Sequence, residues 1–160
     1  MAEDLSTLLN TYFRTGVVES ISVRPERVQL PKSVEQVVAI EGKGLDGDHY
    51  KANNGTRQVT LIQSEDLITV ASFLGRDRID PLLTRRNIVI REFNLNSLKG
   101  KSFQLGEAIL EYTGECHPCS RMEQNLGKGG YHAMRGRGGI TARVLKTGLI
   151  KVGDSLLPLT

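Results

Sequence analysis

The stretch Phe103-Gln104-Leu105-Gly106-Glu107-Ala108-Ile109-Leu110 decides the fold class, and Ile150-Lys151-Val152-Gly153-Asp154-Ser155-Leu156-Leu157 repeats its pattern near the C-terminus. In each stretch, the alternation of apolar and polar residues that is typical of a strand is interrupted by a glycine and an acidic residue and then resumes. Each is therefore predicted to be a hairpin-like unit of strand, turn and strand. Two such units favour a closed or strongly curled sheet over a series of strand–helix–strand crossovers.

Alternation elsewhere predicts further strands, and two segments have helical spacing instead. The strand segments are 15–24, 34–40, 57–63 and 86–91. Apolar residues within 1–14 recur at helical spacing behind Asp4, and we expect this short helix to pack against the domain. A second helix is predicted to have Ser64 as its cap and to end at Gly75. The expected fold is mainly β, a closed or strongly curled β-barrel with a few short helices.

Length and composition favour a single domain, residues 1–160, in which 1–14 hold the N-terminal helix and 15–160 the barrel. A chain of 160 residues can bury a core without disulfide staples. Seventeen glycines and no tryptophan suit a turn-rich β protein better than a helical bundle. No run is long and apolar enough to span a bilayer, no signal peptide opens the chain, and two cysteines are not a disulfide framework. We therefore expect a cytoplasmic protein.

Positive charge is concentrated in one segment, although the formal net charge is only +3. Residues 124–153 contain eight of the glycines and no acidic residue. Their basic residues are Lys128, Arg135, Arg137, Arg143, Lys146 and Lys151. Guanidinium groups beside glycine N–H groups suit phosphate or a similar oxyanion. A solvated face and a nucleic-acid surface are the alternatives, although only Tyr131 offers aromatic stacking in this segment.

The main chemical candidate is the stretch Cys116-His117-Pro118-Cys119-Ser120-Arg121. A Cys-x-x-Cys pair occurs in zinc sites, thiol redox centres and carrier thiols. A structural zinc site needs four ligands, and His49, His117 and His132 are the candidates to join the thiols, none at finger-like spacing. A thioredoxin-like centre needs a strand–helix–strand pattern that the flanks do not show.

A single reactive thiolate beside cationic groups is the third interpretation of this stretch. Arg121 and a charged His117 would stabilise a neighbouring thiolate, and a helix that begins near Ser120 would add its positive end. The fourth interpretation, for Cys116 above all, is a small buried apolar residue. The residues alone leave these interpretations open.

Six short motifs follow one another between about residue 15 and the end of the chain. They are Gly44-Leu45-Asp46-Gly47-Asp48-His49, Arg57-Gln58-Val59-Thr60-Leu61-Ile62, Arg86-Asn87-Ile88, Leu95-Asn96-Ser97-Leu98-Lys99-Gly100, Pro118-Cys119 and Arg137-Gly138-Gly139-Ile140-Thr141-Ala142-Arg143-Val144. In this order they resemble the MOSC family, which is named for the C-terminal domain of molybdenum cofactor sulfurase. The resemblance implies a β-barrel with small helices, which agrees with the strand pattern.

The resemblance also implies where the chemistry lies. In the family, the cysteine after the proline carries sulfur or binds molybdenum through its thiolate, and here that residue is Cys119. The other residues that the resemblance places around a molybdenum cofactor (molybdopterin) are His49, Arg57, Arg86, Asn87, Arg121, Arg137, Gly138 and Gly139. Arginine matches phosphate oxygens in paired contacts, and glycine lets backbone N–H groups approach an anion closely.

By resemblance the protein would be an enzyme, either a molybdenum-cofactor-dependent reductase of N-hydroxylated compounds or a sulfur transferase. Its partners would be a small-molecule substrate, a sulfur donor or acceptor protein, or an electron-donor protein, and a homo-oligomer is one arrangement that would complete the pocket. Nothing in the chain resembles the lysine-centred pyridoxal phosphate site of the parent sulfurase. The alternatives are a non-catalytic module that binds a polyanion such as nucleic acid, and a zinc-stabilised module that uses Cys116 and Cys119. Neither nucleic acid nor a membrane is the expected partner.

Overall fold

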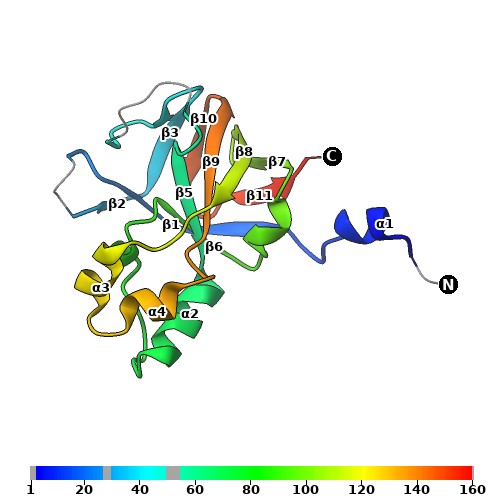
Figure 1. Ribbon diagram of the computed structural model, residues 1–160. Coiled ribbons are helices and arrows are strands. Elements are labelled where there is room, and N and C mark those ends of the chain that lie inside the picture. The colour runs from blue at the N-terminus through cyan, green and yellow to red at the C-terminus, as the bar shows by residue number, and fades with distance from the viewer. Residues whose placement is uncertain (1–2, 27–29, 50–54, 160) are drawn as a thin grey trace.

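The computed structural model describes residues 3–26, 30–49 and 55–159. Over these residues the chain forms a closed barrel with short helices at one end (Figure 1). The barrel strands are β1 (Gly16–Val23), β5 (Val59–Gln63), β6 (Ile88–Arg91), β7 (Ser102–Leu105), β8 (Ala108–Glu115), β9 (Ile140–Lys146) and β11 (Ser155–Pro158). The prediction of a mainly β, closed barrel is confirmed.

Strand pairing closes the barrel through the β1–β11 pair, in which Gly16 lies opposite Leu156. The order around the sheet is β11-β7-β8-β9-β5-β6-β1, and β2 (Lys32–Val34) extends it from β1. The β5–β6 pair is parallel and the other pairs are antiparallel. Inward-facing aliphatic residues and Phe103 fill the barrel, which makes it a packed core.

A small second sheet lies beside the barrel, with β3 (Gln36–Ile40) between β10 (Gly148–Lys151) and β4 (Gly44–Leu45). The predicted strand 34–40 is therefore two strands, which separate at Glu35. The first hairpin is confirmed, since β7 pairs with β8 around Gly106 and Glu107.

The second predicted hairpin is wrong, because β10 and β11 join different sheets. At the bend, Gly153 has a φ of 94° and the Asp154 carboxylate accepts a hydrogen bond from the Lys151 N–H at 2.8 Å. The Gly153 N–H donates to the Val18 carbonyl, and the Asp154 carbonyl accepts from the Val18 N–H, both at 2.8 Å. This contact directs β11 toward β1 and so completes the barrel.

Three helices gather at one end of the barrel, α2 (Ser64–Phe73), α3 (Ser120–Leu126) and α4 (Gly130–Met134) (Figure 1). They share a second apolar cluster that includes Val70, Met122 and Met134. Two 3-10 helices, η1 (Pro81–Thr84) and η2 (Leu95–Leu98), flank β6. The predicted stop of α2 at Gly75 is confirmed by its φ of 66°.

Ser64 is not the cap of α2, as the sequence suggested, but its first residue. Its hydroxyl lies 3.3 Å from Glu19 Oε1 on β1, and this contact takes the place of a capping hydrogen bond to the helix. Gln63 holds the cap position without a capping side-chain hydrogen bond.

The N-terminal helix α1 (Leu5–Leu9) is present and Asp4 caps it, through a hydrogen bond from the Thr7 N–H at 2.8 Å. It does not pack as expected, because it has no buried residue, and in Figure 1 it projects from the barrel. Across the described residues, no helix has the length and apolar character needed to cross a membrane.

Candidate functional site

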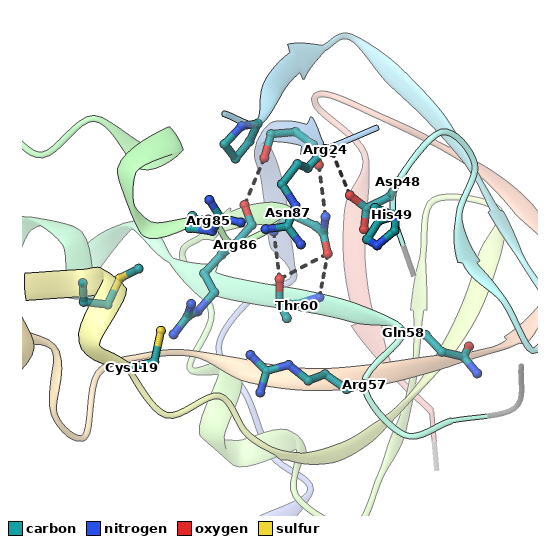
Figure 2. A pocket seen from close by; sticks show the side chains of 13 residues that line it. Arg24, Asp48, His49, Arg57, Gln58, Thr60, Arg85, Arg86, Asn87 and Cys119 are labelled. Atoms are coloured by element: carbon teal, nitrogen blue, oxygen red, sulfur yellow. Dashed lines mark hydrogen bonds between the residues drawn. The ribbon is translucent and has the colours of Figure 1, made fainter. Parts of the chain in front are cut away.

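A pocket of about 220 Å³ opens between the barrel and the helical end, and Cys119 lies at its rim (Figure 2). Its lining comes from the end of β1, the residue before β2, the loop after β4, β5 with the two residues before it, the turn between η1 and β6, and the start of α3. The lining residues are Ser22, Arg24, Pro31, Asp48, His49, Arg57, Gln58, Thr60, Arg85, Arg86, Asn87, Cys119 and Met122. The structure thus brings together five of the residues that sequence placed in the site, namely His49, Arg57, Arg86, Asn87 and Cys119.

Cys119 is the exposed thiol of this pocket. It occupies the N-cap position of α3, where its carbonyl accepts the Met122 N–H at 2.9 Å and its side chain makes no capping bond. The predicted helix start near Ser120 is confirmed. The sulfur is therefore accessible from the pocket and is not consumed by the helix terminus.

Arg86 lines the pocket as a buried cation that fixes the cysteine stretch. Its guanidinium donates to the carbonyl of Gly138 at 2.7 Å, of Thr84 at 2.9 Å and of Cys116 at 3.2 Å. Burial lowers the pKa of Arg86, while negative charge on Cys116 or Cys119 would raise it. Because arginine stays protonated even so, these carbonyls hold a permanent positive charge beside the thiols.

The electrostatic character of the pocket is cationic. Among the residues that the structure describes, four arginines line it, Arg24, Arg57, Arg85 and Arg86, against a single carboxylate, Asp48. Desolvation raises the pKa of Asp48, although N–H groups of Arg24 and Asn87 act in the opposite direction. The pocket as a whole therefore favours an anionic ligand.

Asp48 has a second role, because it ties the loop after β4 to the end of β1. Its Oδ1 accepts the Arg24 N–H at 2.8 Å, and the next residue, His49, donates its N–H to the Arg24 carbonyl at 2.7 Å. This pair of contacts places the imidazole of His49 at the pocket (Figure 2). Asp48, the second aspartate of the loop motif, is thus both a tether and a lining residue.

The raised pKa of Asp48 predicts a pH effect on stability. Between its ordinary value of 3.8 and its higher folded value, the folded state binds more protons than the unfolded state. The stability that Asp48 contributes is fully present below 3.8 and is lost as the pH rises through the folded pKa. We expect the free-energy cost of Asp48→Asn, measured by urea unfolding, to be larger near pH 4 than near pH 7.

Asp46→Asn removes an exposed carboxylate from the same loop and controls for the change in net charge. A cost of Asp48→Asn that grew from pH 4 to pH 7 would contradict this assignment.

Asn87 connects three strands at the floor of the pocket (Figure 2). Its Oδ1 accepts the Thr60 N–H at 3.0 Å and lies 3.1 Å from the Thr60 hydroxyl, and its Nδ2 donates to the Ser22 carbonyl at 3.2 Å. The contacts link the start of β6 to β5 and β1. The Asn87 side chain therefore influences the shape of the pocket by holding these three strands together.

Asn87→Ala is expected to lower the free energy of unfolding by about 2 kcal/mol, because the Thr60 N–H and the Ser22 carbonyl both lose a partner in a partly buried position. Chemical denaturation measures the change. Asn96→Ala, at an exposed residue of η2, is the matched control and should change stability by less than about 0.5 kcal/mol. Equal effects of the two variants would contradict the role given to Asn87.

Four other residues that sequence placed in the site do not line the pocket. Arg137 contacts Asp66 at 3.3 Å and lies over the Phe73 ring, on the α2 side. Arg121 is exposed on α3. Gly138 and Gly139 lie against backbone, since an added Cβ would meet the Cys116 carbonyl at the first and the Leu61 carbonyl at the second. These glycines support the cysteine stretch from behind.

A second arginine of the basic segment is also paired with a carboxylate. Arg143 pairs with Glu111 at 3.0 Å, just as Arg137 pairs with Asp66. The acid-free segment therefore receives carboxylate partners from β8 and α2. Within the described ranges, no group of three or more His, Cys, Asp and Glu side chains is arranged to hold a metal ion. His117 is mostly exposed and lies 3.8 Å from Glu115.

Comparison with known proteins identifies the family. The model of the MOSC domain matches residues 41–157. The chain belongs to the MOSC domain family. A search of curated proteins found no match.

Solved structures share the fold of this MOSC domain. YuaD from Bacillus subtilis is 20% identical with a TM-score of 0.77, over 91% of this chain and 96% of that one. YiiM from Geobacillus stearothermophilus is 18% identical with a TM-score of 0.73, over 91% of this chain and 75% of that one. YiiM from Escherichia coli is 17% identical with a TM-score of 0.71, over 92% and 70% of the two chains.

The MOSC family is associated with the molybdenum cofactor, and the residues of this pocket fit part of such a group. A soft thiol at the rim suits a transition metal, and the arginines suit a phosphate. The volume of about 220 Å³ is below the roughly 300–1,000 Å³ of pockets that enclose drug-sized ligands. The pocket is therefore too small to enclose a large ligand completely.

Sequence reasoning missed Arg24 and Arg85 as lining residues of this MOSC domain. Arg85 follows η1 with a φ of 60°, a left-handed conformation that is uncommon for a residue other than glycine and that turns the chain at the pocket. The adjacent arginines Arg85 and Arg86 could have indicated the site from the sequence. Two neighbouring positive charges at the start of a predicted strand suggest a binding role for both, whereas a solvated surface position would need only one. Arg24 carried no comparable signal, since only the fold brings the end of β1 to this site.

Proposed function

We propose that this MOSC domain binds an anionic, molybdopterin-type ligand, or carries a sulfane sulfur, on the thiol of Cys119. The observation that carries the proposal is the placement of one exposed thiol at the rim of a pocket whose described lining includes four arginines and one aspartate. A carboxylate-rich pocket would repel such a ligand, and a buried thiol would not reach it. The same arrangement suits an enzyme of sulfur transfer or of reduction of N-hydroxylated compounds.

Each group has a physical role in the proposal. Cys119 supplies the sulfur, and Arg24 and Arg57 supply paired donors to phosphate oxygens at the pocket wall. Arg86 contributes its positive charge rather than hydrogen bonds to the ligand, since its N–H groups already bond to carbonyls. When bound, the cofactor would supply the two-electron redox chemistry of molybdenum. The polypeptide would orient it and neutralise its charge.

A cytoplasmic location is part of the proposal, because both cysteines are free and a reducing compartment keeps a reactive thiol available. A small-molecule substrate and a protein that donates sulfur or electrons are the proposed partners.

The test is to purify the protein from a host that makes molybdopterin and to assay molybdenum, pterin and persulfide. We expect at least one of them in near-stoichiometric amount. Absence of all three in protein with an intact Cys119 would overturn the proposal. The assay needs no knowledge of the substrate.

Two arginine variants test the location of the ligand. Arg24→Gln removes a cation from the pocket wall, and we expect ligand retention to weaken by about ten-fold or more, since one charged hydrogen bond contributes about 1.5–3 kcal/mol. Arg121→Gln is the matched control, because Arg121 is exposed and does not line the pocket. Equal losses from both variants would show that the ligand binds outside the pocket.

A further inference from the structure

The two thiols of the Cys-x-x-Cys stretch differ sharply in their surroundings. Cys119 is exposed at the pocket, whereas Cys116 is 1% exposed and follows directly on β8. The Cys116 N–H donates to the Gly139 carbonyl at 2.8 Å, so its backbone continues the pairing of β8 with β9. One thiol is open to reagents and the other is buried.

The buried sulfur is nevertheless not in a purely apolar environment. Arg57 Nη2 lies 3.4 Å from Cys116 Sγ and is placed to donate to it. The guanidinium of Arg86 bonds to the Cys116 carbonyl at 3.2 Å. Negative charge that develops on the Cys116 sulfur would therefore face two cations, which is an arrangement that an inert core cysteine does not need.

The same two arginines connect Cys116 to Cys119. Arg57 and Arg86 line the pocket together with Cys119, and charge on either sulfur acts on the Arg86 guanidinium. Only His117 and Pro118 separate the two cysteines, and neither belongs to a helix or strand. The connection is thus short, and its two residues lie outside the sheet and the helices.

We propose that Cys116 is the resolving thiol of this site, which attacks Sγ of a Cys119 that carries sulfur as a persulfide and closes an intramolecular disulfide. This inference rests on the proposed function in its sulfur-carrying form. Cys116 loses its proton to solvent, and its thiolate attacks Sγ of a Cys119 persulfide. The bond between the two cysteine sulfurs forms, the sulfur–sulfur bond of the persulfide breaks, and hydrosulfide leaves with the electron pair.

The electrons balance within this step. The sulfane sulfur is reduced to sulfide, and the two cysteine thiols are oxidised to a disulfide. An external dithiol, protein or small molecule, returns the pair to the reduced state by thiol–disulfide exchange. The site would therefore deliver hydrosulfide and require a dithiol reductant in each cycle.

The first experiment uses dithionitrobenzoate, an aromatic disulfide that releases a coloured thiolate each time that it or its mixed disulfide is attacked. The reagent should react first at exposed Cys119, and Cys116 should then displace the second coloured thiolate. We expect two equivalents per chain and a Cys116–Cys119 disulfide by peptide mass mapping.

Matched variants isolate each thiol in the same assay. Cys116→Ala should release one equivalent and keep a stable mixed disulfide on Cys119, and Cys116→Ser is the second variant in case alanine impairs folding. Cys119→Ser should release almost none on this timescale, because Cys116 is buried. Wild-type protein that stops at one equivalent, or that ends with both cysteines capped separately, would overturn the inference.

The second experiment loads the protein with inorganic polysulfide and measures hydrosulfide release. Wild-type protein should release hydrosulfide and form the disulfide, whereas Cys116→Ala should retain the Cys119 persulfide at least ten-fold longer. Equal retention by both proteins would overturn the inference and leave the proposed function intact. Failure of the proposed function gives a different pattern, in which purified protein carries neither cofactor nor persulfide while the dithionitrobenzoate reaction still proceeds to the disulfide.

Discussion

Gly138→Ala is expected to lower the free energy of unfolding by about 3 kcal/mol or more, the upper end of the range for an overpacked interior position. A Cβ at Gly138 would lie 2.0 Å from the Cys116 carbonyl oxygen and 3.2 Å from Arg86 Nη2. The first neighbour is backbone, so relief requires β8 and β9 to separate where they support the cysteine stretch. Chemical or thermal unfolding measures the loss.

The displacement should also be visible at the thiols. Because Arg86 donates to the carbonyls of both Gly138 and Cys116, movement of one strand breaks part of that set. We expect Cys116 to become accessible to thiol reagents in Gly138→Ala. Gly114→Ala is the matched control in the same strand pair, since its Cβ would lie 3.5 Å from the Thr141 hydroxyl oxygen, an ordinary contact. Equal stability of the two variants would disprove the close-packing argument.

Cys119→Ser is expected to reduce bound molybdenum, pterin or persulfide to background. A serine hydroxyl fills nearly the same space, but it is neither a soft metal ligand nor able to hold a sulfane sulfur. Cys116→Ser should reduce loading less, because Cys116 is buried beneath the pocket. Metal analysis, pterin fluorescence and persulfide labelling of the purified variants provide the measurements.

The stability of Cys119→Ser distinguishes a loss of chemistry from a loss of fold. Cys119 is exposed and its side chain makes no capping bond, so unfolding should shift by less than about 0.5 kcal/mol. Equal and negligible effects of Cys119→Ser and Cys116→Ser on loading would remove the central claim about the site.

The fold was predictable where the signals were local. The alternation across Gly106 and Glu107 specified a true hairpin, because a two-residue turn needs only neighbouring residues. The similar pattern at Gly153 and Asp154 wrongly predicted a second hairpin, because distant contacts with Val18 make β10 and β11 diverge. The cap predicted at Ser64 is wrong for the same reason, because the distant contact of Ser64 with Glu19 replaces the local capping bond.

The site was predictable in part, for a related reason. Arg57, Arg86 and Cys119 lie in short motifs, and the structure places them around one pocket. Arg137 belongs to an equally distinctive motif, but its guanidinium turns to Asp66 on α2. A motif identifies which residues are special, whereas the side on which each side chain emerges depends on strand register and on partners far along the chain.

The pair that closes the barrel has a kinetic consequence. Gly16 and Leu156 belong to the first and last described strands, so the sheet stays open at β1 until nearly the whole chain is available. Pairing between such distant segments makes folding slow, since loop closure must precede the contacts that reward it. During synthesis, β1 therefore keeps an unpaired edge at Gly16 and Val17 until β11 has been made.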